Sequence, residues 1–209
     1  MGLYENGIDT RKAILAACSR LFVEKGYHNS SIDDICREAH VNRGSIYYHF
    51  KDKENIRYEV FWNQILGAIS TVRQFCSDPD CDTMLAMFVL WDSMCRDEGV
   101  RRFHMDYFND YPVFAPHCNL PRAFMVLNDR MYQNALTVST RSRLPSAALY
   151  GYLSGMVRLS GSGEYTPLQL FEQCFVGGNL IRGVPKDEID SVWQTLQANI
   201  GVIAASLQS

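Results

Sequence analysis

Apolar residues recur at helical spacing along most of the chain. Between residues 9 and 25 they follow an i, i+3, i+4, i+7, i+8 pattern, which forms one face of an amphipathic helix. The residues of this stripe are Ile14, Ala17, Cys18, Leu21 and Phe22. The alternation of apolar and polar residues that is typical of strands is not found in a convincing form. The sequence therefore predicts an all-α protein.

The first two helices have recognisable ends. Asp9 or Thr10 can cap the start of the first helix, and Gly26 can end it in a left-handed conformation. Ser31 opens the second helix, and Asp34 stands three residues later, which approximates a capping box. These signals predict a first helix that ends near residue 25 and a second that begins after residue 31.

Two further caps follow at once. Asn42 is predicted to cap a short third helix over residues 43–49, and Asp52 a fourth that runs to about Cys76. Beyond it, Pro and Gly residues divide the chain. Later helices are predicted over residues 82–97, 100–109, 121–141, 146–160, 167–182 and 187–206. The segment 111–116 holds two prolines and is predicted to be irregular, either near a pocket or as a packed connection.

Composition and charge narrow the class of protein. The chain has 209 residues, of which 47% are hydrophobic and 21% charged, as in folded domains. Its formal net charge is −3, and residues 1–55 hold eight basic and eight acidic side chains. Contact with nucleic acid would therefore depend on where the basic side chains lie. Neither a signal sequence nor a membrane-spanning segment is recognisable, so a cytoplasmic protein is expected.

The second and third helices are separated by a tight turn, as in a helix-turn-helix unit, whose last helix enters the DNA major groove. Ile46 and Phe50 stand four residues apart and are predicted to anchor this helix inward. The outer face is left to Arg43, Ser45, Tyr47, Tyr48 and His49. Gly44 permits close approach to the duplex. Lys51 and Lys53 stand at the start of the next helix, a position that favours anions.

Residues 8–56 resemble the DNA-binding domain of TetR-type (TetR/AcrR-like) transcriptional regulators. The block from Ile46 to Phe50, followed by Lys51-Asp52-Lys53-Glu54, stands at that family's spacing. The resemblance implies a homodimeric regulator, usually a repressor, with a small-molecule pocket in the C-terminal body. It implies base-facing positions at Arg43, Gly44, Ser45 and Tyr48, and phosphate-facing positions at Ser31, Tyr47, His49 and Lys53.

One residue departs from the family's pattern. His40 stands where that family usually has Gly, between the second helix and the Val. A positive φ would strain a His mildly. The departure therefore bears on the detail of the turn and leaves the resemblance in place.

The chain is predicted to divide into a DNA-binding head, residues 1–52, and a ligand-binding and dimerisation body, residues 53–209. Aromatic side chains cluster in the body, as an apolar pocket requires. The candidate pocket residues are Phe88, Trp91, Phe103, His104, Tyr107, Phe108, Tyr111 and Phe124. An ordinary helical core has the same composition, so each residue could instead be core.

The last two predicted helices carry apolar residues that suit a four-helix dimer interface, the arrangement that the resemblance implies. The candidate interface residues are Phe171, Phe175, Val192, Trp193, Leu196 and Ile200. Gly177, Gly178 and Gly201 would allow close approach of helices. Packing inside a single chain is the alternative explanation for the same residues.

Other functions fit the sequence less well. Seven cysteines without a CxxC motif indicate free thiols, although a thiol sensor could use Cys76, Cys81, Cys95 or Cys118. A metal site is disfavoured for His104, Asp106, His117 and Cys118, because the first two diverge on a helix and no metal-binding motif is present. No cofactor motif is found either. A helical enzyme or scaffold with a vestigial head is a further alternative. The sequence thus predicts a repressor that is released from a palindromic operator by an apolar or aromatic effector.

Overall fold

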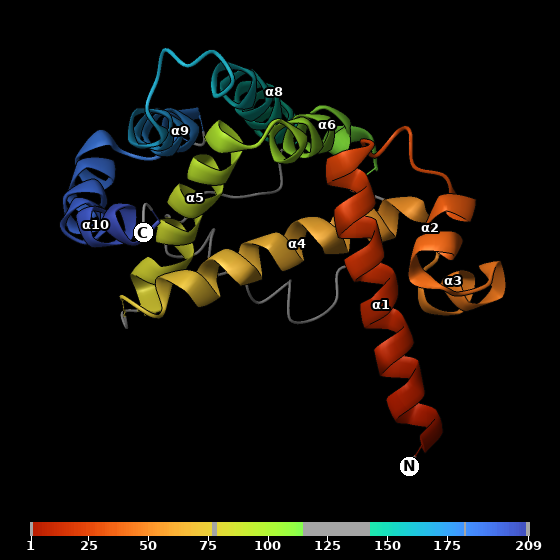
Figure 1. Cartoon of the computed structure of the whole chain (residues 1–209). Coiled ribbons are helices and arrows are strands. Elements are labelled where there is room, and N and C mark those ends of the chain that lie inside the picture. Colours follow the sequence, from red (N-terminus) through yellow and green to blue (C-terminus); the bar gives the residue numbers. More distant parts are fainter. Residues whose placement is uncertain (1, 77–78, 115–142, 182, 208–209) are drawn as a thin grey trace.

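The structure, a computed structural model, describes residues 2–76, 79–114, 143–181 and 183–207. Within these ranges every regular element is an α-helix (Figure 1), which confirms the predicted fold class. The helices are α1 (Gly2–Glu24), α2 (Ile32–Ala39), α3 (Arg43–His49), α4 (Lys53–Val72), α5 (Pro79–Arg96), α6 (Glu98–Phe114), α8 (Arg143–Leu159), α9 (Pro167–Ile181) and α10 (Lys186–Ser206).

Most predicted boundaries agree with the structure to within a few residues, and three differ more. The first helix begins at Gly2, so the predicted cap at Asp9 or Thr10 is wrong, and both residues lie inside α1. The fourth helix ends at Val72, four residues before the predicted end. The segment predicted to be irregular after residue 110 continues α6 as far as Phe114, so Pro112 lies in the last turn of a helix. The helix predicted over residues 121–141 lies outside the described residues.

The caps of α2 and α3 follow the predicted chemistry. The Ser31 backbone N–H donates to the Asp34 carboxylate over 2.9 Å, and the Asp34 N–H donates to the Ser31 hydroxyl over 3.1 Å, which completes a capping box. The Asn42 side-chain oxygen accepts from the Ser45 N–H over 2.9 Å. His40 is left-handed with φ 54°, as its place in the turn requires. Local sequence therefore sets the turn between these helices.

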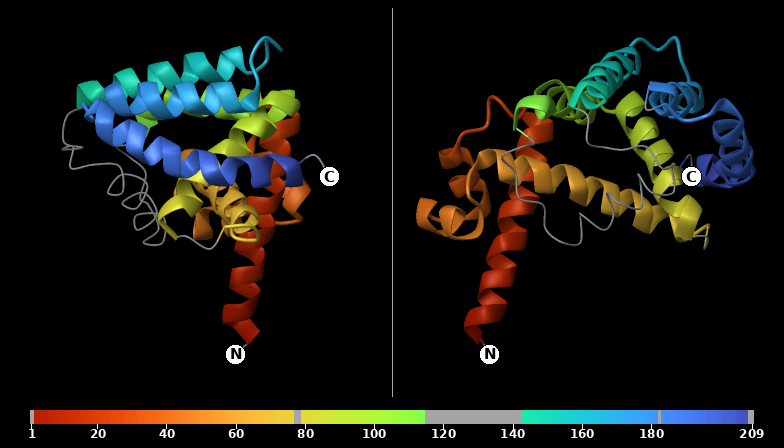
Figure 2. Two further views of the ribbon diagram at one scale, coloured as in Figure 1. Left: turned by 90° about the vertical axis from the view of Figure 1, so that its left-hand side faces the viewer. Right: turned by 180° about the vertical axis from the view of Figure 1, so that it is seen from behind.

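The helices form a head and a body that α4 joins. α1, α2 and α3 gather at one end of the molecule with the start of α4, while α5, α6, α8, α9 and α10 pack along and beyond the rest of it (Figures 1 and 2). The N-terminal half of α1 projects away from the body (Figure 2). α4 therefore reaches from the head to the body without a break.

The head and the body also meet where α1 ends and α6 begins. A Cβ atom on Gly99 would lie 2.3 Å from the Val23 carbonyl oxygen, so only glycine allows this approach of the two backbones. The Arg102 guanidinium donates to the carbonyl oxygens of Val23 and Glu24 over 2.7 and 3.0 Å. This cation satisfies carbonyls that the end of α1 leaves unpaired. The N-terminal turns of α6 are thereby fixed to the head.

A buried arginine reinforces the same junction. Arg57 of α4 is 2% exposed, and its guanidinium lies 2.7 Å from the Asp110 carboxylate of α6. His28 lies 3.1 Å from the same carboxylate, and the Tyr27 ring lies 3.7 Å beneath the guanidinium. Removing one partner of such a pair leaves a buried charge uncompensated, so these residues link α4, α6 and the segment after α1.

Candidate nucleic-acid interface and effector pocket

α3 has one buried face and one exposed face. Ile46 and Phe50 are 1% and 3% exposed, which confirms their predicted anchoring role. Tyr47 and Tyr48 are 55% and 84% exposed, although Ile46 on the same helix is buried in the core. Phenol rings with hydroxyl groups held outward can contact phosphates and base edges. α3 therefore presents a polar and aromatic surface to a partner.

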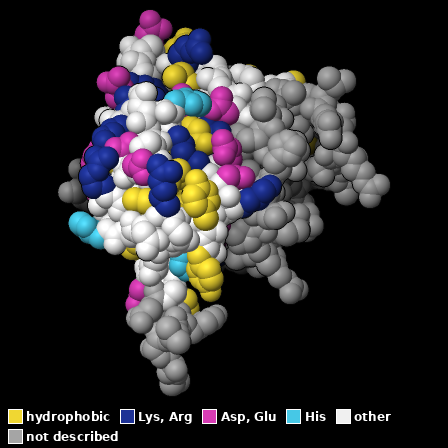
Figure 3. All heavy atoms as spheres, turned by 90° about the vertical axis from the view of Figure 1, so that its right-hand side faces the viewer, with side chains coloured by type: hydrophobic (Ala, Val, Ile, Leu, Met, Phe, Trp, Pro, Cys, Tyr) yellow, Lys and Arg dark blue, Asp and Glu magenta, His cyan; other side chains and the backbone are white. Residues whose placement is uncertain are grey.

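Acidic and basic side chains alternate around this face. Figure 3 shows them interleaved on the end of the molecule that carries the head, without one continuous basic patch. Arg43 begins α3, and its Nε and Nη2 atoms lie 2.8 and 2.6 Å from the two carboxylate oxygens of Asp33 on α2. This bond lowers the pKa of the exposed Asp33 carboxyl. One edge of the guanidinium is thus occupied, and the edge that contains Nη1 is left to face a partner.

Two predicted phosphate contacts have partners within the head. The Ser31 hydroxyl donates to Asp34 over 2.6 Å. The Lys53 ammonium donates to the Ser30 carbonyl oxygen over 2.7 Å and lies 4.2 Å from the centre of the Tyr27 ring. Burial lowers the pKa of Lys53. These two side chains are held by the head itself, whereas Lys51 is exposed.

The first half of α1 lies beside α3. A hollow between the two helices is lined by Gly7, Thr10, Asn42, Gly44, Ser45, Tyr48 and His49. Four of these are predicted DNA-binding residues, so the structure brings them together with two residues of α1. Nothing in the sequence marks Gly7 or Thr10 as part of this surface, because neither side chain is typical of a binding site.

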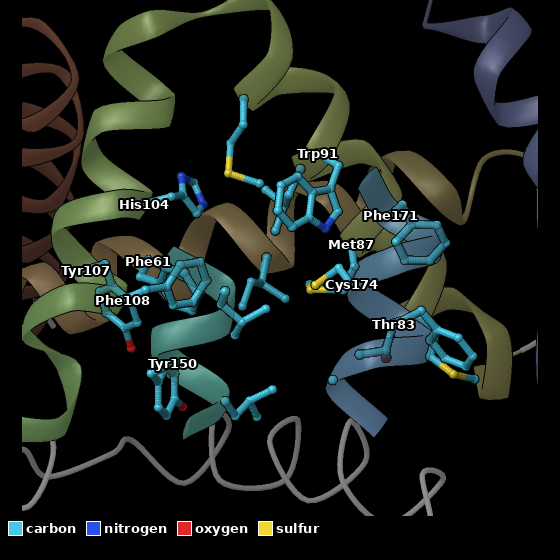
Figure 4. A pocket seen from close by; sticks show the side chains of 18 of the residues that line it. Phe61, Thr83, Met87, Trp91, His104, Tyr107, Phe108, Tyr150, Phe171 and Cys174 are labelled. Carbon is cyan, nitrogen blue, oxygen red and sulfur yellow. The ribbon is translucent and has the colours of Figure 1, made fainter. Parts of the chain in front are cut away.

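An apolar cavity of about 190 Å³ lies in the body. Five helices, α4, α5, α6, α8 and α9, contribute to its wall, and Figure 4 shows ten of their side chains by name. The lining residues are Phe61, Trp62, Ile65, Thr83, Met84, Met87, Leu90, Trp91, Met94, His104, Tyr107, Phe108, Leu149, Tyr150, Leu153, Phe171, Cys174, Phe175, Gly178 and Asn179. A pocket of this composition can bind a small apolar molecule.

Four of the predicted pocket residues line this cavity: Trp91, His104, Tyr107 and Phe108. Two others do not. Phe103 packs toward the head, with its ring centroid 6.0 Å from that of Phe22, and Phe88 is buried beside Phe171. The side chains of Tyr111 and Phe124 lie outside the described residues.

Sequence reasoning missed the contributions of α4, α8 and α9 to the pocket. Their apolar residues have the spacing of core residues, and Phe61 even stacks on Tyr107 with ring centroids 3.8 Å apart. The methionines Met84, Met87 and Met94 were a usable signal, because flexible thioethers are common in adaptable apolar sites.

His104 is the buried imidazole in the pocket wall. It is 1% exposed, and its Nδ1 atom lies 3.0 Å from the Val100 carbonyl oxygen. Because a carbonyl oxygen only accepts, Nδ1 carries the proton, and Nε2 of the neutral ring is an acceptor. Nε2 is buried without a hydrogen-bond partner among the described protein atoms. Burial lowers the pKa of His104 to about 4, against a smaller opposing effect of the Val100 bond.

The comparisons with known proteins agree with the geometry of the head. Residues 14–60 match the model of the bacterial regulatory proteins of the tetR family. By this match, the head of the chain is similar to tetR-family regulatory proteins. A repressor named BepR from Brucella suis is 46% identical over 48 residues, which are 23% of each chain. The regulator AcrR from Shigella flexneri is 42% identical over 53 residues, 25% of each chain.

The matches to these curated relatives thus span about a quarter of their length. Among solved structures, RolR in complex with resorcinol is 16% identical, with a TM-score of 0.49 over 90% of this chain and 94% of that one.

The predicted dimer residues lie mostly inside the chain. Phe171, Trp193, Leu196 and Ile200 are between 0% and 7% exposed within one chain, so they are unavailable to a second copy. Phe175 and Val192 are partly buried, and Phe175 lines the pocket. The stripe faces inward because α9 and α10 cover α5, which is the intramolecular alternative that the sequence left open.

Gly177 and Gly178 also serve packing inside the chain. A Cβ atom on Gly177 would lie 2.3 Å from the Tyr152 hydroxyl of α8, and that hydroxyl donates to the Gln173 carbonyl oxygen over 2.7 Å. A Cβ atom on Gly178 would meet Leu149. These two glycines therefore let α8 and α9 approach each other.

The described cysteines are free, and burial disfavours the thiolate form of three of them. Burial raises the pKa of Cys18 and of Cys174 to about 12, and it also raises the pKa of Cys95. A thiolate is the reactive form, so these thiols are poor redox sensors. Of the other sensor candidates, Cys76 is buried, and the side chains of Cys81 and Cys118 lie outside the described residues.

Two features are absent from the described part of the chain. No group of three or more His, Cys, Asp or Glu side chains there could hold a metal ion. None of its helices combines the length and the apolar character that crossing a bilayer requires. Of the residues considered as metal ligands, His117 and Cys118 lie outside the described residues.

Proposed function

We propose that this protein is a transcriptional regulator that binds a palindromic operator as a homodimer and is released from it by a small, apolar or aromatic effector. The observation that carries the proposal is the exposed face of α3, on which Tyr47 and Tyr48 project from a helix anchored by Ile46 and Phe50. The match of residues 14–60 to the tetR family supports it. Repression in the cytoplasm is the form of regulation that we propose, and no residue is proposed to be catalytic.

On the DNA side, α3 enters the major groove. Arg43, Gly44, Ser45 and Tyr48 face the bases, and Tyr47, His49 and Lys51 face phosphates. Ser31 and Lys53 were predicted to face phosphates too, but their side chains are engaged within the head. We assign them a supporting role, in which they position α2 and the start of α4.

Arg43 reads a base with the edge that Asp33 leaves free. A guanidinium can bind guanine O6 and N7 with two donors at once. Asp33 occupies Nε and one hydrogen of Nη2, so Nη1 and the other hydrogen of Nη2 form the reading edge. Because both bonds to Asp33 fix the plane of the group, the arginine reaches DNA already oriented.

The pocket acts on the head through two helices. α4 carries Lys53 and Arg57 in the head and Phe61 in the pocket wall. α6 carries Arg102, which binds the carbonyl oxygens at the end of α1, and His104, which lines the pocket. Since these helices belong to both regions, the proposed limits 1–52 and 53–209 mark a change of role within one continuous core. An effector that binds the two head orientations unequally, by about 1–3 kcal/mol, would release DNA.

For the dimer, we propose the outer face of α10 in place of the buried residues. Ala198, Gly201, Val202 and Ala205 are exposed along it, and Val202 is 57% exposed. Small side chains let helix axes approach closely. Two copies joined there would present two α3 helices to half-sites about 34–36 Å apart, or a multiple of that spacing.

Selection of bound sequences from a random duplex library tests this function. The full chain should enrich a palindrome, and a chain with Tyr48→Ala should enrich none, because the variant loses contacts on the exposed face alone. Tyr165→Ala provides a matched control, since Tyr165 is also exposed, at 44%, but lies in the body between α8 and α9. Failure of the folded wild-type chain to enrich any sequence would contradict the proposal.

A further inference from the structure

We infer that the body pocket binds a neutral, single-ring molecule with a hydrogen-bond donor, of the phenol class, and that the donor binds Nε2 of His104. This inference rests on the proposed function, because it names the effector class of the same pocket. Figure 4 shows the imidazole on one side of the space that Trp91, Phe61 and Tyr150 surround. The ring therefore belongs to the wall and is not behind it.

The acceptor atom of His104 indicates that the ligand carries a hydrogen-bond donor. Its Nδ1 is bound to Val100, and Nε2 is an acceptor without a partner among the described protein atoms. A buried acceptor that stays unpaired costs free energy, which a ligand donor would recover. A ligand N–H or O–H group is thus the chemistry that matches this acceptor.

Several other polar groups of the wall have partners inside the protein. The Thr83 hydroxyl donates to Asp82 over 2.9 Å, and the Asn179 amide donates to the Phe175 carbonyl oxygen over 2.8 Å. The Trp91 indole N–H bonds to the Cys174 sulfur. These three donors are therefore occupied, whereas Nε2 of His104 is an acceptor that a ligand donor can pair.

The charge of the ligand follows from the wall. None of the described lining residues is Asp, Glu, Lys or Arg, and the imidazole is neutral at pH 7 because burial lowers its pKa to about 4. A carboxylate or an ammonium group would be buried without an opposite charge, which is strongly unfavourable. The pocket consequently favours a molecule that is uncharged at neutral pH.

The size of the ligand follows from the cavity. Its volume is about 190 Å³. An apolar protein cavity of roughly 150 Å³ is enough to hold benzene. One ring with one or two small substituents therefore fits, and the rings of Phe61, Tyr107, Phe108 and Trp91 provide flat surfaces for it.

Titration of the full chain with three probes tests this inference without DNA. Phenol and toluene have similar size and differ in the donor, and benzoate adds a charge. Phenol should bind about three to ten times more tightly than toluene, which is the range that one net hydrogen bond provides. Benzoate should bind more weakly than both. In protein with 15N-labelled histidine, phenol should shift the Nε2 resonance of His104, and toluene should shift it much less.

The substitution His104→Phe removes the acceptor and keeps a ring of similar size. It should abolish the preference for phenol over toluene. Met87→Leu is the matched control, because Met87 also lines the pocket and the exchange conserves volume. This variant should keep the preference. If His104→Phe does not fold, the wild-type affinities and the Nε2 shift decide the question alone.

Three results would overturn the inference: toluene binding as tightly as phenol, benzoate binding more tightly than phenol, or a persistent phenol preference in folded His104→Phe. None of them bears on DNA binding, so the regulator proposal would survive. Conversely, a chain that enriches no DNA but prefers phenol would overturn the regulator and keep the ligand class. Release of a selected operator by phenol, and not by toluene at equal concentration, would show that ligand binding in the pocket controls DNA binding.

Discussion

The face of α3 and the pocket of the body differ in how the chain builds them. The face comes from a seven-residue helix with the capping residue before it, and its exposed and buried residues are neighbours in the sequence. The pocket comes from five helices, and its wall extends from Phe61 to Asn179. A surface of the first kind is specified by a short motif, whereas a site of the second kind exists only once distant helices have packed.

The two regions are nevertheless not independent. The close approach of Gly99 to Val23 and the bonds of Arg102 join α6 to the end of α1. The Arg57–Asp110 pair joins α4 to α6. These contacts form a junction between the face of α3 and the pocket, through which one region can influence the other.

The largest loss of stability is expected from a substitution on the buried side of the α3 segment. Phe50→Ala removes a ring that is 3% exposed, so the free energy of unfolding should fall by about 3–5 kcal/mol. Tyr48→Ala, two residues earlier, should change it by less than about 0.5 kcal/mol, because that ring is exposed. Urea denaturation of both variants measures the difference. Equal losses would mean that α3 does not have separate core and partner faces.

A methyl group added where α6 meets the end of α1 should cause the second-largest loss of stability. Gly99→Ala places a Cβ atom against the Val23 backbone, which cannot yield as a flexible side chain can, so unfolding should become easier by about 1–3 kcal/mol. Gly67→Ala is the control, because no atom lies within 4 Å of its Cβ position in α4. That control should be neutral or stabilising by up to about 1 kcal/mol. A Gly99→Ala protein as stable as the control would refute the close contact.

The pocket imidazole should make stability depend on pH. The pKa of His104 falls from 6.5 to about 4 on folding, so the unfolded chain binds more protons between these values. The stabilisation is complete above pH 6.5 and is lost as the pH falls toward 4, by about 3 kcal/mol in total. Denaturation of wild type and His104→Phe at pH 7 and pH 4.5 should show the steeper loss in wild type. Parallel losses would show that His104 is solvated.

The smallest effect is expected at the Asp33–Arg43 pair. Asp33→Asn should weaken the discrimination between bases at one operator position by a few-fold. The reason is that Asp33 no longer holds the Arg43 guanidinium in one orientation. Glu38→Gln is the control, since Glu38 also binds both Nε and Nη2 of an exposed arginine, Arg20. Competition binding with single-base variants of the operator measures both. Identical base preferences in the two variants would remove Asp33 from recognition.

Particular residues show which parts of this account could be predicted. The caps at Ser31 and Asn42 depend on neighbours within a few residues, and the sequence predicted both. At His40 the sequence raised the question of a positive φ, and the structure answers it. Lys53 is different, because its ammonium binds the Ser30 carbonyl oxygen and the Tyr27 ring. A flexible cation at a helix start could equally face a phosphate, and only the packing of α4 against the head decides between them.

The residues of the pocket were harder still to predict from the sequence, for the same reason. Phe103 and Tyr107 are four residues apart on α6, with the spacing of one helical face, yet Phe103 contacts Phe22 of the head and Tyr107 lines the pocket. The sequence identified the aromatic segment but could not divide it. The division depends on where α1 ends, which Gly99 and Arg102 fix through tertiary contacts.

Operator binding by wild type and Tyr48→Ala at two salt concentrations tests the central claim most directly. Wild-type affinity should fall at least tenfold between about 50 and 200 mM salt, because phosphate contacts release counterions. Tyr48→Ala should bind about ten to a hundred times more weakly at either concentration, with unchanged stability. A variant that binds as tightly as wild type, or a wild-type affinity that does not respond to salt, would contradict the assignment of α3 as the DNA-reading helix.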